Sequence, residues 1–358
     1  MTRRLLVAAL VLLPNLGTAQ KTTMSFGGFV DTYLAWDPGK PPTIDRAYTT
    51  QAARSGEFNV NLAFIDAILA GDRVRGRIAL QAGTSVEANY FSEPTTGRYS
   101  GASLAQHLQE AYVGARLSKT AWIDAGIFLS HTGSENWVSR DNPTYTRSLI
   151  ADFAPYYESG AKVTWQVRPD LTALVTVVNG WQKISENNAD KSFGMRLEWS
   201  VSPHISLGYY NLIGNDEPDT ASAQVRFYNG LTVKWSSNEW TVMATVDGGR
   251  QDTPDKKPPS WWGGALIARA QTTEHTGFSA RVETFSDPKQ VLVATGVTSP
   301  FRAIGASLGF DFTMSEGAVW RTEYRALRSP DDIFIDRGGP AGRSRSNMLI
   351  VTSLAVTF

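Results

Sequence analysis

The residue types of a hydrolytic site come together around one histidine. Ser130, Ser134 and Glu135 lie within four positions of His131, a combination that could supply a base and a nucleophile. Serine and glutamate are common in any polar loop, so we expect no catalytic centre there. The other histidines lie in short turns or at loop edges: His107, His204 and His275.

Other catalytic and metal-binding chemistry is excluded by what the sequence lacks. There is no cysteine, which removes thiol catalysis, disulfides and thiolate metal sites. No G-x-S-x-G or H-E-x-x-H motif occurs, and the loop acids lack the spacing of calcium ligands. Thirty-four basic residues balance thirty-four acidic ones, with no basic excess for nucleic acid. We therefore predict no catalytic residue, metal, cofactor or nucleic-acid partner.

The charged residues alternate with apolar ones. In residues 193–199, Arg196 and Glu198 share one face of an extended chain and the apolar side chains share the other, and residues 278–284 and 319–326 repeat the pattern. These segments are strands with one apolar and one polar surface. The charged side chains that we expect to line a watery interior are Arg77, Glu87, Glu110, Arg116, Arg196, Glu198, Arg226, Arg269, Arg281, Glu283, Asp311, Arg321, Glu323 and Arg325.

The connections between these strands alternate in length. Seven are very short, near 71–72, 118–119, 168–170, 202–204, 237–238, 272–273 and 315–316. Eight are longer and polar, near 37–56, 91–105, 132–154, 182–190, 214–222, 250–260, 286–299 and 329–345. This asymmetry is typical of bacterial outer-membrane barrels, which have short periplasmic turns and longer extracellular loops. The sequence predicts an all-β, antiparallel, up-and-down transmembrane barrel of about sixteen strands.

Aromatic residues gather near both ends of the predicted strands, which suggests two membrane interfaces. Those near short turns are Trp122, Trp165, Trp199, Trp235, Trp240 and Trp320. Those near the loops are Tyr33, Trp36, Tyr90, Phe91, Tyr156, Tyr157, Trp181, Tyr209, Tyr210, Trp261 and Trp262.

Both ends of the chain carry targeting features. Arg3 and Arg4, the apolar run 5–13 and the small residues before Gln20 predict a signal peptide over residues 1–19, followed by a single barrel domain over 20–358. The last strand ends on Phe358, which resembles the signal that the outer-membrane barrel assembly machinery recognises. We expect export to the outer membrane of a Gram-negative bacterium.

Closure and charge placement together predict a pore. A closed sheet leaves no unpaired edge in lipid, and each arginine on the lipid side would cost roughly 2–4 kcal/mol near the midplane. The arginines must then point inward, and barrels of sixteen to eighteen strands enclose water. We expect weak selectivity with a slight preference for anions. The longest connection, 131–154, carries Glu135, Arg140, Asp141 and Arg147 and is a candidate constriction, with an exposed surface loop as the alternative.

Four short stretches resemble the OmpL-like β-barrel porin family: residues 26–33, 133–135, 145–160 and 177–181. The second reads Gly133-Ser134-Glu135, and the third runs from Tyr145-Thr146-Arg147-Ser148-Leu149 to Pro155-Tyr156-Tyr157-Glu158-Ser159-Gly160. The resemblance implies a porin-like outer-membrane barrel and brings no established substrate or catalytic residue.

The sequence thus favours a water-filled pore for passive diffusion of small polar solutes or ions, in contact with outer-membrane lipids. A homotrimer is expected only by analogy with other sixteen-stranded porins. An outer-membrane barrel enzyme and a structural barrel without an open pore are the alternatives.

Overall fold

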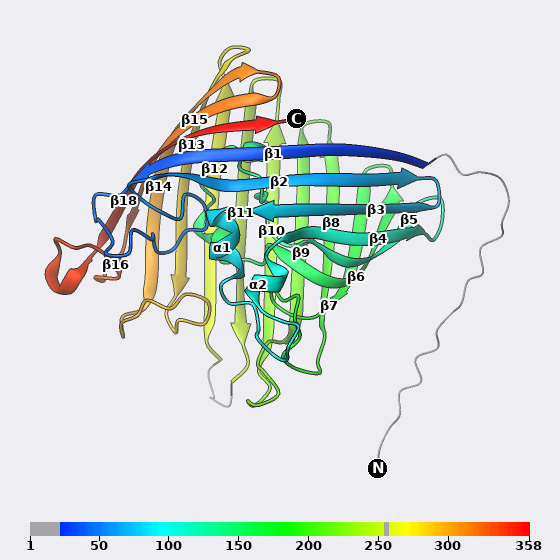
Figure 1. Cartoon of the computed structure of the whole chain (residues 1–358), viewed down its shortest axis with the longest axis horizontal. Helices are drawn as coiled ribbons and strands as arrows, with labels where there is room; N and C mark the ends of the chain where they lie inside the picture. The colour runs from blue at the N-terminus through cyan, green and yellow to red at the C-terminus, as the bar shows by residue number, and fades with distance from the viewer. Residues whose placement is uncertain (1–21, 254–257) are drawn as a thin grey trace.

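The computed structural model describes residues 22–253 and 258–358, and the predicted signal peptide lies outside them. Within these residues sixteen strands form a closed antiparallel barrel (Figure 1). They are β1 (Thr22–Trp36), β2 (Phe58–Gly71), β3 (Val74–Ala82), β4 (Leu108–Arg116), β5 (Ala121–Leu129), β6 (Tyr157–Arg168), β7 (Leu171–Val178), β8 (Ser192–Ser202), β9 (Ile205–Asn215), β10 (Val225–Ser236), β11 (Trp240–Gln251), β12 (Ser260–Gln271), β13 (Thr276–Asp287), β14 (Phe301–Ser315), β15 (Ala318–Arg328) and β18 (Ser346–Thr357). The predicted fold class and strand number are confirmed.

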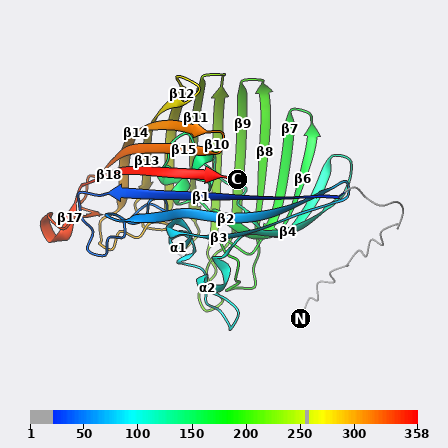
Figure 2. The ribbon, with the colours of Figure 1, turned by 45° about the horizontal axis from the view of Figure 1, so that its top comes forward.

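The barrel closes between its first and last strands. β1 pairs antiparallel with β18, Phe29 opposite Thr357, and Figure 2 shows the two strands side by side. Gly28 and Phe358 exchange backbone hydrogen bonds of 2.9 and 3.1 Å across this seam. Every other strand pairs with its neighbours along the chain, except that β15 pairs with β18 past the small hairpin β16 (Phe334–Ile335) and β17 (Arg343–Ser344).

The short helices all lie in the connections. They are α1 (Thr84–Tyr90), α2 (Ala102–Ala105), α3 (Leu149–Asp152) and the 3-10 turns η1 (Ser139–Asp141) and η2 (Pro340–Gly342). In the described part of the chain no helix has the length and apolar character needed to span a bilayer.

Turns and loops segregate as expected. Connections of two to four residues, such as 72–73, 117–120 and 316–317, lie at one end, whereas the long connections 37–57, 83–107 and 130–156 lie at the other. β1 therefore begins, and β18 ends, at the barrel end that carries the short turns, as an even strand number requires.

Side-chain parity divides the wall into two faces. On β14 the outward Leu308 is 66% exposed, whereas Ser307 beside it is buried. On β13 the outward Val282 is exposed and its neighbours Arg281 and Glu283 are buried. An exposed apolar face outside and a charged face inside is the arrangement of a barrel in lipid.

The two aromatic bands fare differently. At the short-turn end, Trp165, Trp199, Trp235, Trp240 and Trp320 are exposed on the outer wall. Trp122 points inward instead, where the guanidinium groups of Arg75 and Arg116 lie 4.6 and 4.8 Å from its ring.

The prediction of an aromatic band at the loop end is largely wrong. Trp36, Phe91 and Trp262 are exposed, but the following rings are buried: Tyr33, Tyr90, Tyr156, Tyr157, Tyr210 and Trp261. The buried rings either have the parity of the inner face or lie in loops that fold back, so they pack inside the barrel.

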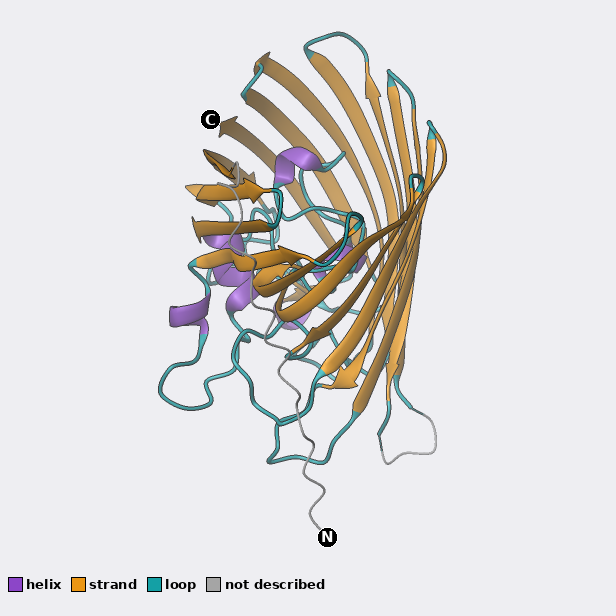
Figure 3. Ribbon diagram, turned by 90° about the vertical axis from the view of Figure 1, so that its right-hand side faces the viewer, coloured by secondary structure: helices purple, strands orange, loops and turns teal. Residues whose placement is uncertain are grey.

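Part of the interior is a dry core. Leu149 and Ile150 of α3 pack against the inner faces of β12 and β13, in one cluster with Phe285 and Trp261. Gly263 provides the space, since a Cβ there would lie 2.2 Å from Ile150. Figure 3 shows loops and short helices inside the curve of the strands.

Candidate functional site

The inner wall carries thirteen of the fourteen charged residues predicted to face the lumen. Glu87 is the exception, because it lies on α1 and its side chain is exposed. The prediction for Glu87 was wrong because β3 ends at Ala82, although Glu87 keeps the inward parity of Arg77 in the sequence. Gly83 follows with φ +137°, and a Cβ there would lie 2.4 Å from the carbonyl oxygen of Asn61.

The connection between β5 and β6, residues 130–156, is the element that shapes the lumen; we call it the inward loop. It leaves β5 on one side of the barrel and makes hydrogen bonds to β13 and β15, on the other side. It also contacts β1, where Ser139 donates a hydrogen bond of 2.7 Å to Asp31. The inward loop therefore crosses the barrel interior rather than lying on the surface.

Five charged residues of β13 and β15 hold the far side of this loop, and we call them the clamp: Arg281, Glu283, Arg321, Glu323 and Arg325. Glu323 accepts hydrogen bonds of 2.7 Å from both the backbone N–H and the hydroxyl of Thr146. Arg281 lies 3.2 Å from Glu323 and donates to the hydroxyls of Thr144 and Thr146 at 2.8 and 2.9 Å.

The second part of the clamp holds the start of α3. Glu283 accepts a 2.7 Å hydrogen bond from the backbone N–H of Leu149. The same carboxylate receives two 2.9 Å hydrogen bonds from Arg325. A charge on the wall thus satisfies a free N–H at the beginning of a helix, which favours that helix start.

Arg321 holds the turn η1 through three backbone carbonyls. It donates to the oxygens of Ser139, Asn142 and Pro143 at 2.6, 3.1 and 3.0 Å. Its Nε donates to Asp311 at 2.8 Å, and Asp311 also pairs with Arg269 at 3.0 Å. Every donor edge of this guanidinium is engaged, which suits the forked geometry of arginine.

The clamp residues point into the barrel but are not surrounded by water. Arg281 and Arg325 are 1% and 2% exposed, and Glu323 is fully buried. The expectation that these residues line a watery passage is therefore wrong for Arg281, Glu283, Glu323 and Arg325, whereas Arg321 also borders a cavity between the loop and the wall. Parity places them on the inner face, but the inward loop covers them, and pairing with opposite charges makes their burial tolerable.

The near side of the inward loop is held by a histidine at its base. His131 Nδ1 lies 2.8 and 3.0 Å from the carboxylate oxygens of Glu158, and Nε2 lies 2.7 Å from the carbonyl oxygen of Asn211. A carbonyl oxygen and an ionised carboxylate can only accept, so with Glu158 ionised both ring nitrogens carry protons. Burial lowers the pKa of His131, but the charge of Glu158 and these hydrogen bonds outweigh it and raise the pKa above its usual value.

Glycine and arginine complete this base. A Cβ at Gly194 on β8 would lie 2.4 Å from the His131 ring, so only glycine leaves room for it. Arg196 donates to the carbonyl oxygens of His131 and Gly133 at 2.7 and 2.8 Å. The loop is thus fixed on β8 and β9 as well as on the clamp.

The four charged loop residues divide into two kinds. Arg140 and Asp141 are exposed to the interior space. Arg147 is fully buried, with its guanidinium 3.7 Å from the Tyr156 ring and 3.6 Å from Asp152. Glu135 accepts hydrogen bonds from Ser148 within the loop, and burial raises the pKa of its carboxyl. Arg147 and Glu135 therefore shape the loop, whereas Arg140 and Asp141 can meet solutes.

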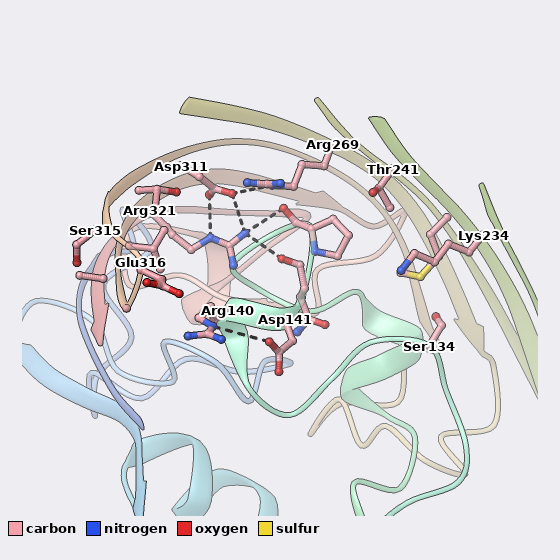
Figure 4. A pocket seen from close by; sticks show the side chains of 17 residues that line it. Ser134, Arg140, Asp141, Lys234, Thr241, Arg269, Asp311, Ser315, Glu316 and Arg321 are labelled. Atoms are coloured by element: carbon pink, nitrogen blue, oxygen red, sulfur yellow. Dashed lines mark hydrogen bonds and ion pairs between the residues drawn. The ribbon is translucent and has the colours of Figure 1, made fainter. Parts of the chain in front are cut away.

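A cavity of about 350 Å³ lies between the inward loop and the wall, at the end of the barrel with the short turns. We call it the turn-side cavity. Figure 4 shows Lys234 and Thr241 across it from Arg321 and Ser315. Its lining holds four cations, Arg140, Lys234, Arg269 and Arg321, and three carboxylates, Asp141, Asp311 and Glu316.

A second cavity, of about 250 Å³, is lined mainly by the inward loop itself and by Arg196; we call it the inner-loop cavity. Ser134 lines both cavities. The Ser134 hydroxyl lies 2.6 Å from that of Thr245 on β11. Sequence reasoning missed Lys234 and Thr241 as lining residues and Thr245 as the partner of Ser134, although each shares the inward parity of its strand.

The other predicted wall residues lie in less crowded surroundings. Arg77 pairs with Asp66 at 2.7 Å and with Glu110, and Arg116 is exposed. Glu198 pairs with Arg196, with side chains 38% and 24% exposed. Arg226, near the loop end, pairs with Asp216 at 2.9 Å.

A closed sixteen-stranded barrel with an apolar outside, charged inside and a loop folded into the lumen defines the class of outer-membrane porins. The chain belongs to the family described as "Putative beta-barrel porin-2, OmpL-like", whose model matches residues 23–358. No curated protein sequence matches it.

Solved structures share the fold at low sequence identity. OmpT of Vibrio cholerae aligns with a TM-score of 0.61 and 9% identity, over 95% of this chain and 99% of that one. The outer-membrane channel DcaP of Acinetobacter baumannii gives 0.63 and 11%, over 94% and 97%. An anion-selective porin from Comamonas acidovorans gives 0.60 and 11%, over 94% and 100%. The chain is thus an outer-membrane porin barrel.

Proposed function

We propose that the protein is a passive diffusion pore for small hydrophilic solutes or ions, narrowed by its inward loop. The observation that carries this proposal is the turn-side cavity, where charged residues of the wall face charged residues of the loop across open space. Such a lining attracts water and polar solutes rather than apolar ones. Because the loop is held on both sides of the barrel, the narrowing is a fixed part of the structure.

We further propose weak selectivity for anions. Four cations against three carboxylates line the turn-side cavity. Asp311 pairs with both Arg269 and Arg321, so this trio carries one excess positive charge, while the other two cations and two carboxylates of the lining balance. Long-range attraction by such a lining enriches small anions, and this enrichment weakens as salt increases.

The surroundings of His131 support a role without enzymatic activity. A catalytic base needs a free ring nitrogen facing a nucleophile. Here Nε2 faces the Asn211 carbonyl, and Ser130 donates its hydroxyl to Glu158. Ser134 lies with Thr245 instead. The cluster considered from the sequence is therefore a structural anchor in this proposal.

Export and assembly complete the proposal. Residues 1–19 act as a cleaved signal peptide, and Phe358 is recognised by the barrel assembly machinery. The protein then resides in outer-membrane lipid as a homotrimer. The exposed apolar side chains of β2 to β4, including Ile65, Ile78 and Val113, offer a surface for contacts between copies. One of the similar structures is described as a trimer form of OmpT.

Single-channel recording in a planar bilayer tests this function. Refolded protein should give steps on the order of hundreds of picosiemens in molar salt, as expected for a wide wet tube. In a salt gradient the reversal potential should have the sign of a small anion preference. Heat-unfolded protein in the same detergent is the control. Folded barrels that insert without conducting would contradict the proposal and favour a structural role.

A further inference from the structure

We infer that solutes cross the inward loop at Ser134, between the loop and the β10–β11 wall, and that Lys234 and Arg196 set the charge preference there. We call this point the neck. The inference rests on the proposed diffusion function and specifies its route. The ligand class is small inorganic or organic anions.

The two cavities lie on either side of Ser134. The turn-side cavity reaches the short turn at Glu316 and Gly317, and the inner-loop cavity lies where the chain returns to β6 at Pro155. Ser134 is in the lining of both. A solute that moves from one cavity to the other therefore meets this residue.

The neck is closed by a weak contact. Ser134 meets Thr245 through one hydrogen bond between two neutral hydroxyls. Ser134 has a short side chain. The preceding residue, Gly133 with φ +79°, has open space where a Cβ would lie. Small rearrangements of hydroxyl groups can open such a contact.

On the opposite side, the inward loop is bound firmly to β13–β15. Passage between the loop and β13–β15 would have to separate Thr146 from Glu323 and Leu149 from Glu283. It would also expose Arg281, whose charge is fully engaged. Breaking buried charged contacts is far more costly than parting two hydroxyls. The route along β10–β11 is therefore favoured.

The charges at the neck select for anions. Within the described chain, no carboxylate lies within ion-pair distance of the Lys234 ammonium, which is exposed in the turn-side cavity. Arg196 lines the inner-loop cavity on the other side of Ser134. Glu135 is the carboxyl nearby, and its oxygens accept hydrogen bonds from the backbone N–H and the hydroxyl of Ser148. A small anion thus meets Lys234, unpaired among the described residues, on one side of the neck and, on the other, Arg196, which also pairs with Glu198.

Cysteine substitution tests the route directly, because the chain has no native cysteine. We propose Ser134→Cys and, as a matched control, Ser307→Cys, an inward serine of β14 that lies opposite Arg281 and Arg325 under the loop. Each variant is recorded in a bilayer before and after addition of a sulfonated methanethiosulfonate. Labelling should reduce the conductance of Ser134→Cys roughly twofold or more and leave Ser307→Cys unchanged.

Charge substitution tests the selectivity. Lys234→Gln should shift the reversal potential in a chloride gradient toward cations, whereas Lys119→Gln, in a short turn at the same end of the barrel, should not. A shift of equal size for both variants would overturn the role of Lys234. Block of Ser307→Cys with no block of Ser134→Cys would overturn the route while leaving the pore intact. Silence of the unmodified protein would instead overturn the diffusion function itself.

Discussion

The two sides of the inward loop rest on very different walls. Toward β13–β15 the loop meets the clamp, where buried arginines and glutamates bond to each other and to the loop backbone. Toward β8–β11 it is held by the bond of its own His131 to the Asn211 carbonyl, by Arg196 and by the Ser134–Thr245 contact, with cavities on either side. Both walls show the same alternation of charged and apolar residues in the sequence.

The difference shows that an inward charge has two possible surroundings. Where a loop supplies matching donors and acceptors, the charge becomes part of a packed core. Where the loop supplies few, the charge stays hydrated and can act on solutes. Under the proposed route, stability and transport therefore depend mainly on opposite sides of one lumen.

Removing a clamp carboxylate should have the largest effect on this comparison. Glu323→Gln leaves the Thr146 backbone without its charged acceptor and leaves Arg281 with Glu283 as its one carboxylate partner in a fully buried place. We expect a loss of about 3–5 kcal/mol in the free energy of unfolding, since a buried charge loses its partner. Urea titration of refolded protein measures it, and bilayer recordings should show noisier, larger openings.

The matched control is Glu198→Gln, because Glu198 pairs with Arg196 where both side chains are partly exposed. A partly solvated pair contributes about 0–1 kcal/mol. Equal losses for the two variants would show that the walls do not differ in the way described.

An intermediate effect is expected at the base of the loop, and it depends on pH. The folded protein raises the pKa of His131, so its contribution to stability is complete below the usual histidine pKa of about 6.5 and is lost as pH rises through the folded value. Glu158 and Arg196 are the charged groups that face the ring. The free energies of unfolding of the wild type and of His131→Gln should therefore differ by about 1.5–3 kcal/mol at low pH, the contribution of a charged hydrogen bond, and become equal at high pH.

His204 provides the control for this experiment. It lies exposed in a short turn, so His204→Gln should follow the wild-type curve at every pH. If the difference between wild type and His131→Gln stayed constant with pH, the ring would not be an imidazolium anchor.

The smallest effect is expected at the neck. Thr245→Val keeps the side-chain shape and removes one neutral hydrogen bond, which should cost about 0.5–1.5 kcal/mol. We expect a slight rise in conductance. Thr232→Val on β10 is the control, since Thr232 faces the interior but makes no side-chain hydrogen bond to the loop within the described chain. A loss of unfolding free energy as large as that of Glu323→Gln would mean that the neck holds the loop as firmly as the clamp does.

The fold could be predicted in detail because its signals are local. Alternation of period two, as in residues 193–199, defines each strand and its faces, and the lengths of the connections define the two ends. The exceptions have local causes too. Glu87 was misplaced because β3 ends at Ala82 and Gly83, with its positive φ, leads the chain into α1. Trp122 was misplaced because nearness to a turn does not determine which face of the wall a side chain occupies.

The site was predictable only in part, because parity gives the face of a residue but not what covers it. Arg281 and Lys234 are both inward, yet one lies under Thr146 and the other in open space. The hydrogen bond between Thr146 and Glu323 joins positions 177 residues apart. No pattern in either segment announces such a contact, whereas the length and composition of loop 131–154 did suggest a role in the lumen.

The seam between β1 and β18 has a consequence for the order of biogenesis. The inward loop belongs to the first half of the chain, and the wall that grips it is synthesised more than a hundred residues later, as the separation of 134 positions between Leu149 and Glu283 shows. Polypeptide segments rarely thread through a ring that is already shut. The nascent sheet must therefore admit the loop while β1 and β18 are still apart, and docking of the final strand seals it inside.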